Sequence, residues 1–337
     1  MKKYISILLS FSILIVSGVL SADTLDTVKS RGKVRCGVNT ALAGFSAPDS
    51  QGKWVGIDVD VCRAVATAIF NDPKKVEFVA LSAQQRFTAL QSGEIDLLSR
   101  NTTLTLQREV GLGLLFADVI YYDGQGFLVT KKSGIKSAKQ LNRRTVCVQP
   151  GTTTELNLAD FARNNKINLK PVVIEKFSDS VNAYIAGRCD AYTTDASGLA
   201  AIRTTVKDPD AHIILPEIIS KEPLAPAVRQ GDDKWYNIVN WTIRALVTAE
   251  ELGIDSANVA RIARSSNITQ NAKRLLDSEL AGQIGLTRSF AYNVISKIGN
   301  YGEIFEKNIG VNSPLKLERG LNNLWTNGGL QYAPPFR

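Results

Sequence analysis

The chain has 337 residues, a formal net charge of +8 and 44% hydrophobic residues. This length exceeds that of one average domain and suits two lobes. Basic residues are scattered singly among acidic ones, without a basic run or interleaved aromatic residues, so the sequence argues against a nucleic-acid-binding protein.

The N-terminus has the pattern of a secretory signal peptide. Lys2 and Lys3 precede an apolar run from Tyr4 to Leu20, which ends in the small residues Ser21 and Ala22. The run is about 17 residues long, at the short limit of a membrane span, so a signal anchor is the alternative. We expect residues 1–22 to be removed by cleavage after Ala22.

The first part of the mature chain alternates strands and helices. The predicted elements are a strand at 33–38, a helix from Asp58, a strand at 76–79, a helix from Ser82 to Gly93 and a strand at 95–99. Ser82 and Gln85 have the spacing of a capping box. Because crossovers between such strands are right-handed, we expect a parallel β-α-β-α-β unit.

A polar motif at residues 101–109 follows the last of these strands. Ligands bind at the carboxyl ends of the strands in open α/β sheets. Thr105 can cap a short helix that carries Arg108 in its first turn, and the planar guanidinium of an arginine suits a carboxylate. The alternative is a polar loop with a solvated arginine.

A later stretch repeats this arrangement. Gly93 and Gly187 each end a helical segment, an aspartate follows three residues later, and a short strand ends eight residues after the glycine. The first copy ends at Asn101 and leads to the cation Arg108, whereas the second ends at the anion Asp195. Two such units facing each other would place opposite charges across a cleft, as a zwitterion such as a free α-amino acid requires.

Residues 121–130 are predicted to cross into a second unit, and 220–226 to cross back. Within this unit we expect strands at 145–148, 172–174 and 213–215 and helices at about 153–163 and 179–186. Thr152, Thr153 and Thr154 open the first of these helices, where hydroxyl and free N–H groups make an anion site. Ordinary helix capping is the alternative for the threonines.

The remaining sequence is mostly helical from Trp235 onward. We expect residues 300–337, which are rich in glycine and asparagine, to form an irregular strap with short helices at 303–308 and 314–325. His212, the only histidine, has no histidine or cysteine at ligand spacing, so it predicts neither a catalytic residue nor a metal site.

Several of these runs resemble the bacterial periplasmic solute-binding proteins that deliver polar amino acids to ABC importers, above all the general L-amino-acid-binding branch. The runs lie at 56–60, 86–93, 149–160, 192–195, 300–306 and 332–335. The resemblance spans the mature chain and implies an α/β, two-lobed, type II-like periplasmic-binding fold with two hinge crossovers. Lobe 1 would comprise 23–129 and the return segment and helical extension at 222–337, and lobe 2 would comprise 130–221.

The same resemblance implies a ligand site. The α-carboxylate clamp of the family falls on Arg108, assisted by Thr103, Thr153 and Thr152. The acceptor for the α-amino group falls on Asp195. Both assignments agree with the charge argument made from the two strand ends.

Three further positions follow from the resemblance. Asn101 stands where many relatives have a serine that contacts the α-amino group, and Phe45 lies near the position of an aromatic cleft wall. Arg86 matches an arginine that reaches the side-chain carboxylate of the ligand in relatives preferring acidic amino acids. The alternative for Arg86 is a structural brace within the lobe.

Four cysteines in an exported chain suggest two disulfides, for which three pairings exist. Cys36 and Cys147 occupy the first strand of their units, and each has one other cysteine within its lobe. We therefore expect the pairs Cys36–Cys62 and Cys147–Cys189, because crossed pairs would tie the lobes together and obstruct hinge motion.

Two functions compete on this evidence. The first is a monomeric periplasmic protein, without cofactor or metal, that captures a broad range of L-amino acids, including glutamate, glutamine, aspartate and asparagine. It would deliver them to the membrane permease subunits of an ABC importer with a cytoplasmic ATPase. The second is a dehydratase-like periplasmic enzyme on the same fold, which needs a general acid or base facing the ligand. Glu109 and Glu155 are better explained as first-turn helix residues.

Overall fold

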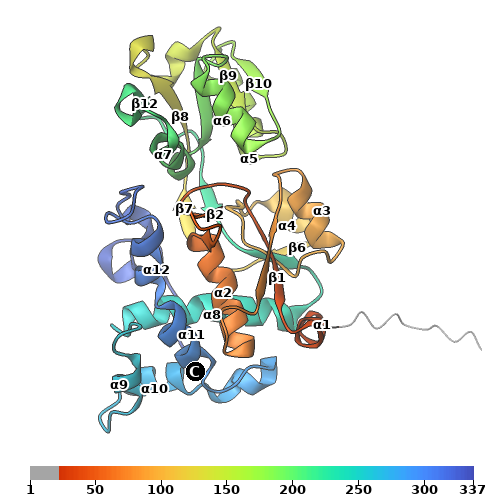
Figure 1. The fold of residues 1–337 in the computed structure, drawn as a ribbon, viewed down its shortest axis with the longest axis vertical. Helices are drawn as coiled ribbons and strands as arrows, with labels where there is room; N and C mark the ends of the chain where they lie inside the picture. The colour runs from red at the N-terminus through yellow and green to blue at the C-terminus, as the bar shows by residue number, and fades with distance from the viewer. Residues whose placement is uncertain (1–22) are drawn as a thin grey trace, which may run out of the picture.

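The computed structural model describes residues 23–337, so the predicted signal peptide at 1–22 lies outside the described residues. Figure 1 shows two α/β lobes stacked along the long axis of the molecule, with the C-terminal helices packed around one of them. Each lobe contains a five-stranded sheet. The two-lobed α/β fold class predicted from the sequence is confirmed.

Lobe 1 is built on a sheet with the strand order β4-β1-β5-β14-β6. Its strands are β1 (Val34–Val38), β4 (Val76–Ala80), β5 (Leu97–Leu98), β6 (Leu114–Phe116) and β14 (Ala227–Arg229). Its first helices are α1 (Thr24–Arg31), α2 (Ile57–Phe70), α3 (Gln85–Gln91) and α4 (Leu106–Leu112), and a hairpin joins β2 (Ala47–Pro48) to β3 (Trp54–Val55). The predicted parallel unit is confirmed, because β1 pairs in parallel with both β4 and β5.

A glycine precedes helix α2 for a steric reason. Gly56 has a φ of 130°, and a Cβ atom there would lie 2.0 Å from the carbonyl oxygen of Phe45. Only glycine permits this close approach of the backbone. The approach fixes the first turn of α2, and with it Asp58, beneath the end of β5.

Lobe 2 has the strand order β10-β9-β11-β8-β12. Its strands are β8 (Gln125–Thr130), β9 (Thr145–Val148), β10 (Lys170–Val173), β11 (Ala191–Asp195) and β12 (His212–Ile214). Its helices are α5 (Thr153–Asn164), α6 (Phe177–Ile185) and α7 (Ala196–Thr205), with short 3-10 turns η1 (Lys131–Ser133), η2 (Ala138–Leu141) and η3 (Pro209–Ala211). In both lobes the fourth strand of the order runs antiparallel to the third.

The repeat seen in the sequence has a structural basis in two aspartates. Asp96 accepts a hydrogen bond from the backbone N–H of Arg35 at 2.7 Å, and Asp190 accepts one from the N–H of Thr145 at 2.8 Å. Each aspartate therefore ties the start of the strand that leads to the site to the neighbouring parallel strand, β5 to β1 and β11 to β9. Because β5 runs parallel to β1 and β11 runs parallel to β9, each carboxyl end lies beside the carboxyl end of that neighbouring strand.

Two short antiparallel strands, β7 (Tyr121–Asp123) and β13 (Glu222–Leu224), connect the lobes, with Glu222 directly opposite Asp123. The return crossing agrees with the expected 220–226. The first crossing ends earlier than the boundary expected after residue 129, because β8 already belongs to the second sheet from Gln125. We therefore propose a first lobe boundary near Gly124, where an added Cβ would lie 2.3 Å from Ile218.

The C-terminal extension packs on lobe 1 (Figure 1). It contains α8 (Asp233–Glu251), α9 (Val259–Ala263), α10 (Gln270–Leu276), η4 (Glu279–Ile284), α11 (Phe290–Ile298) and α12 (Tyr301–Asn308). The helix predicted at 314–325 is wrong. Only the 3-10 turns η5 (Gly320–Asn322) and η6 (Trp325–Asn327) form in this region, where Lys316 and Gly320 have positive φ angles that interrupt a right-handed helix. Among residues 23–337, no helix combines the length and apolar character needed to cross a membrane.

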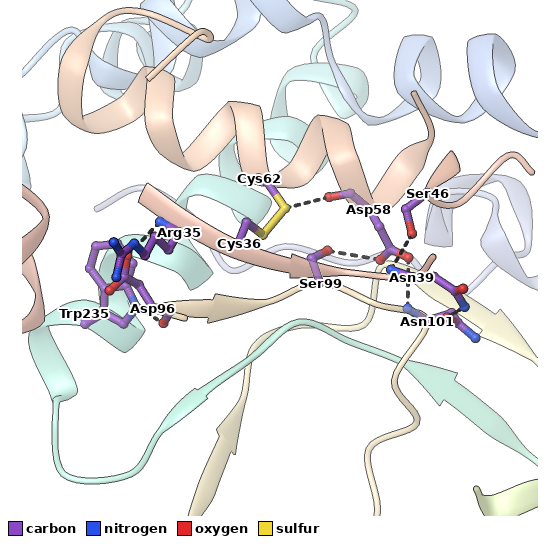
Figure 2. The surroundings of a disulfide bond; sticks show 10 residues. All are labelled: Arg35, Cys36, Asn39, Ser46, Asp58, Cys62, Asp96, Ser99, Asn101 and Trp235. Atoms are coloured by element: carbon purple, nitrogen blue, oxygen red, sulfur yellow. Dashed lines mark hydrogen bonds between the residues drawn. A yellow bond between two sulfur atoms is a disulfide. The ribbon is translucent and has the colours of Figure 1, made fainter. Parts of the chain in front are cut away.

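Both predicted disulfides are confirmed. Cys36 on β1 is bonded to Cys62 on α2, as Figure 2 shows, and Cys147 on β9 is bonded to Cys189 just before β11. Each bridge lies within one lobe. Neither bridge therefore restrains the hinge.

We expect each disulfide to stabilise its lobe measurably. The bridges span 26 and 42 residues of sequence, and loops of these lengths are worth about 3.5 to 4 kcal/mol in the chain-entropy account. Replacing both cysteines of either pair with alanine should lower the free energy of unfolding by this order in urea titrations followed by circular dichroism. Non-reducing peptide mapping that linked Cys36 to Cys147 would contradict the pairing.

Candidate functional site

A cavity of about 30 Å³ lies between the lobes, at the carboxyl ends of β5 and β11. It is lined by Asn39, Leu42, Ala83, Arg86, Arg100, Asn101, Thr103, Gln149, Thr152, Thr153, Thr154, Phe177, Thr194, Asp195 and Gly198. Six of the eight predicted ligand-binding residues are among them. The other two, Arg108 and Phe45, do not line the cavity.

Asn101 lies three residues after the end of β5, in a conformation that few residues adopt. Its φ is +34°, and two hydrogen bonds of its own hold it there (Figure 2). The Asp58 carboxylate accepts hydrogen bonds from the Asn101 N–H at 2.9 Å and from the Ser99 hydroxyl at 3.0 Å. The Asn39 amide donates to the side-chain oxygen of Asn101 at 3.0 Å. A backbone held in a sparsely populated region beside a cavity is typical of a functional site.

Burial raises the pKa of Asp58 to about 6, although the hydrogen bonds from Asn101 and Ser99 and the charge of Arg100 each lower it. The side chain is 1% exposed. Burial therefore outweighs the two hydrogen bonds that Asp58 accepts. This carboxylate supports the turn at Asn101 and does not line the cavity.

Two buried arginines line the cavity from lobe 1. The Arg86 guanidinium donates to the Thr102 hydroxyl at 3.3 Å and, across the lobes, to the carbonyl oxygen of Gly151 at 3.5 Å. Its Nε has no hydrogen-bond partner among the described residues. Burial holds the pKa of Arg86 well below its usual range, and the charges of Arg108 and Arg100 lower it further. Part of the hydrogen-bonding capacity of Arg86 is therefore free.

Arg100 was not identified from the sequence, although it immediately precedes Asn101. It donates to the carbonyl oxygen of Leu81 at 2.9 Å, and burial lowers its pKa to about 10. A second arginine at the end of an apolar strand was the available signal. It was missed because alternation along such a short strand does not reveal which side chain reaches the cleft.

Arg108 does not line the cavity itself but lies behind Thr103, which does. Thr105 caps α4 as predicted, since its hydroxyl accepts from the Arg108 N–H at 3.2 Å. The Arg108 guanidinium donates to the carbonyl oxygen of Thr103 at 2.8 Å and lies over the ring of Phe87, 5.1 Å from its centre. Burial lowers the pKa of Arg108 to about 10, and the nearby carboxylates of Glu222 and Asp195 raise it.

Asp195 ends β11 and faces the cavity from lobe 2. Its side chain caps no helix N–H, and within residues 23–337 no group donates a hydrogen bond to it. Burial raises the pKa of Asp195 well above its usual range, and the neighbouring Asp123 and Glu222 raise it further. A buried acceptor without a donor is costly, so this position suits a ligand that brings its own N–H groups.

The threonines at the start of α5 divide into two roles. The Thr152 hydroxyl accepts from the Glu155 N–H at 3.1 Å and donates to the Gln149 carbonyl at 2.8 Å, which is ordinary helix capping. The Thr153 hydroxyl instead donates to the Glu222 carboxylate at 2.8 Å. Thr103, from lobe 1, donates to the same carboxylate oxygen at 2.6 Å.

The aromatic wall differs from the prediction. Phe45 is 1% exposed and packs edge-on against Tyr121 in the core of lobe 1, with ring centres 5.4 Å apart. Phe177, the first residue of α6, lines the cavity from lobe 2. The sequence lacked a signal for Phe177, because it lies far along the chain from the motifs at the strand ends.

The cavity can therefore bind a molecule that carries both charges. Arg86 and Arg100 supply positive charge from lobe 1, and Asp195 supplies negative charge from lobe 2. Residues 23–337 contain no group of three histidine, cysteine, aspartate or glutamate side chains that could hold a metal ion.

Comparison with known proteins places these residues in context. The bacterial extracellular solute-binding proteins, family 3, match residues 34–254. The general L-amino acid-binding periplasmic protein AapJ of Rhizobium johnstonii is 56% identical over 100% of this chain and 99% of its own length. The glutamate/glutamine/aspartate/asparagine-binding protein BztA of Rhodobacter capsulatus is 52% identical over 96% of each chain.

A solved structure supports the same fold. The ABC transporter periplasmic binding protein from Brucella ovis, with glutathione bound, is 55% identical and superimposes with a TM-score of 0.91. The match covers 94% of this chain and 100% of the Brucella ovis chain.

The raised pKa of Asp58 predicts a pH dependence of stability. Between its usual value of 3.8 and about 6, the unfolded chain releases the proton while the folded protein keeps it, so stability falls as the pH rises through this window. The change amounts to about 3 kcal/mol. The free energy of unfolding of the wild type, relative to Asp58→Asn, should fall by this order between pH 3.5 and 7. Parallel pH profiles of the two proteins in urea titrations would contradict the assignment.

Proposed function

The chain belongs to the bacterial extracellular solute-binding proteins of family 3, and we propose that it captures free L-amino acids in the periplasm for an ABC importer. One observation carries this proposal. The buried carboxylate of Asp195 accepts no hydrogen bond from residues 23–337, and it shares the cavity with two buried arginines. The ammonium group of a free amino acid supplies the hydrogen-bond donors that Asp195 lacks. The amino acid also supplies a carboxylate for the cationic side of the cavity.

In the proposed complex, the α-ammonium group donates to Asp195 and to the side-chain oxygen of Asn101. The α-carboxylate lies at Thr103 and Thr153, within reach of the Arg108 charge behind them. Both threonines line the cavity, and Arg108 contacts Thr103 directly. Ion pairs withdrawn from water in this way are stronger than exposed ones.

Binding and release require the lobes to separate. The lobes contact each other around the cavity through residues of both lobes, so a ligand enters and leaves only when these contacts open. Besides the Thr153–Glu222 and Arg86–Gly151 bonds, the Ser82 hydroxyl donates to the Glu175 carboxylate across the lobes at 3.3 Å. The two hinge strands are short, and both disulfides leave them free to absorb a rotation.

We propose a broad ligand range that includes glutamate, glutamine, aspartate and asparagine. The names of AapJ and BztA support this range. Arg86 and Arg100 favour a side chain that accepts hydrogen bonds, and an arginine donates to a neutral amide oxygen as well as to a carboxylate. Glutathione belongs in the ligand panel, because its glutamyl end carries a free α-amino and α-carboxylate group.

The proposed working unit is one chain, exported by cleavage after Ala22, which delivers its ligand to membrane permease subunits driven by a cytoplasmic ATPase. The relatives with half or more of their sequence in common are named as binding proteins, which favours binding over the dehydratase-like alternative. His212 lies outside the cavity lining, and its ring contacts the Tyr184 hydroxyl at 2.7 Å.

Removing either clamp charge should abolish measurable binding. Asp195→Ala and Arg108→Ala each leave a ligand charge buried without its partner, at a cost of roughly 3–5 kcal/mol. The dissociation constant for glutamate should rise by more than about 100-fold in calorimetry of protein freed of bound ligand by unfolding and refolding. Asp179 and Arg163 are both exposed, so Asp179→Ala and Arg163→Ala serve as matched controls and should bind like the wild type. A folded Asp195→Ala variant within about threefold of wild type would rule out the clamp.

Arg86 should affect ligands unequally. Arg86→Met keeps much of the stem but removes the donors, so affinity should fall most for glutamate and aspartate, less for glutamine and asparagine, and least for alanine. Calorimetry with this series measures the difference. An equal loss for glutamate and alanine would show that Arg86 braces the lobe and does not select the ligand.

A further inference from the structure

Asp195 occupies a position at which an aspartate usually caps a helix. It is the N-cap residue of α7 and has the non-helical backbone angles of such a residue. An aspartate there normally accepts a hydrogen bond from the N–H of the second or third helical residue, here Ser197 or Gly198. The Asp195 side chain accepts from neither of them. Its carboxylate is therefore left for another partner, although the start of α7 still needs a cap.

Asp123, the last residue of the hinge strand β7, supplies this cap. Its two carboxylate oxygens accept from the Ser197 N–H at 3.4 Å each, and the carboxylate also accepts from the Ser197 hydroxyl. The Gly124 N–H donates to Asp123 at 2.8 Å, and the Gly124 carbonyl oxygen accepts from the Ala196 N–H at 2.8 Å. The end of the hinge strand thus satisfies the first two N–H groups of α7.

Asp123 also disfavours the capping position for Asp195 through its charge. Burial raises the pKa of Asp195, and the charge of Asp123 raises it further, so the two carboxylates lie close enough to repel each other. Without Asp123, the Ser197 N–H would be free and the repulsion would be gone. The Asp195 carboxylate would then accept from the start of α7, as aspartates at N-cap positions usually do.

We propose that Asp123 is a positioning residue for ligand binding, which caps α7 in place of Asp195 and so keeps the Asp195 carboxylate available to the ammonium group of the ligand. Asp123 itself does not line the cavity. The inference rests on the proposed function, because it takes the ligand group at Asp195 to be an ammonium group. In a protein without Asp123, the ligand would have to displace Asp195 from the N–H groups of α7, and its affinity would fall.

Two substitutions of Asp123 separate the cap from the charge. Asp123→Ala and Asp123→Asn both remove the negative charge, but asparagine caps helices as well as aspartate does. In calorimetry with L-glutamate, Asp123→Ala should raise the dissociation constant roughly five- to tenfold, as the loss of a typical cap implies. Asp123→Ser, whose side chain is too short to reach α7, should give the same result. Asp123→Asn should bind within about twofold of the wild type. An equal loss in the alanine and asparagine variants, or a loss in neither, would overturn the proposal.

A double-mutant cycle on protein freed of ligand follows the cap itself. In the wild type, Asp195→Ala removes no capping bond, so the urea midpoint of unfolding should stay the same or rise. In the Asp123→Ala background Asp195 has become the cap, so adding Asp195→Ala should lower the midpoint. The same shift in both backgrounds would contradict the assignment. Because the cycle needs no ligand, it still tests Asp123 if the wild type binds no amino acid and the proposed function fails.

Discussion

Buried charge is the constraint on which this structure depends. Asp195, Glu222, Arg86 and Arg108 are each no more than 7% exposed, and they come together where the two lobes meet. Burial shifts the pKa of Asp195 upward and that of Arg86 downward, so each charge needs an opposite charge nearby. Glu222 obtains donors from both lobes, whereas Asp195 obtains none from the described chain. Because Asp195 has no donor of its own and buried arginines lie nearby, the region suits a zwitterion, whose ammonium group can pair with Asp195.

The parts of the site that local patterns encode could be predicted from the sequence. Asn101 and Asp195 were identifiable because each lies eight residues after a glycine that follows a helix, with a short strand between them. Thr105 was identifiable as the cap that places Arg108 in the first turn of α4. The disulfide pairing followed from assigning each cysteine to its lobe. Secondary-structure periodicity and capping chemistry act over a few residues, so the sequence displays them directly.

Contacts between distant segments could not be predicted in this way. Thr103 and Glu222 are 119 residues apart, and no local pattern indicates that their side chains meet. Glu222 lies in a segment that was recognised only as a crossing. Similarly, Phe45 packs into the core because Tyr121 from the hinge approaches it, and Arg108 lies behind Thr103 because of how α4 packs. The helix predicted after residue 314 does not form, because Lys316 and Gly320 have positive φ angles that sequence periodicity does not reveal.

The most direct measurement of the central claim is a crystal structure of the protein grown with L-glutamate after removal of any ligand carried through purification. The account predicts the ligand ammonium within hydrogen-bonding distance of the Asp195 carboxylate. It also predicts the α-carboxylate within hydrogen-bonding distance of the hydroxyls of Thr103 and Thr153. Glutamate bound between the lobes with its ammonium group away from Asp195 would contradict the account.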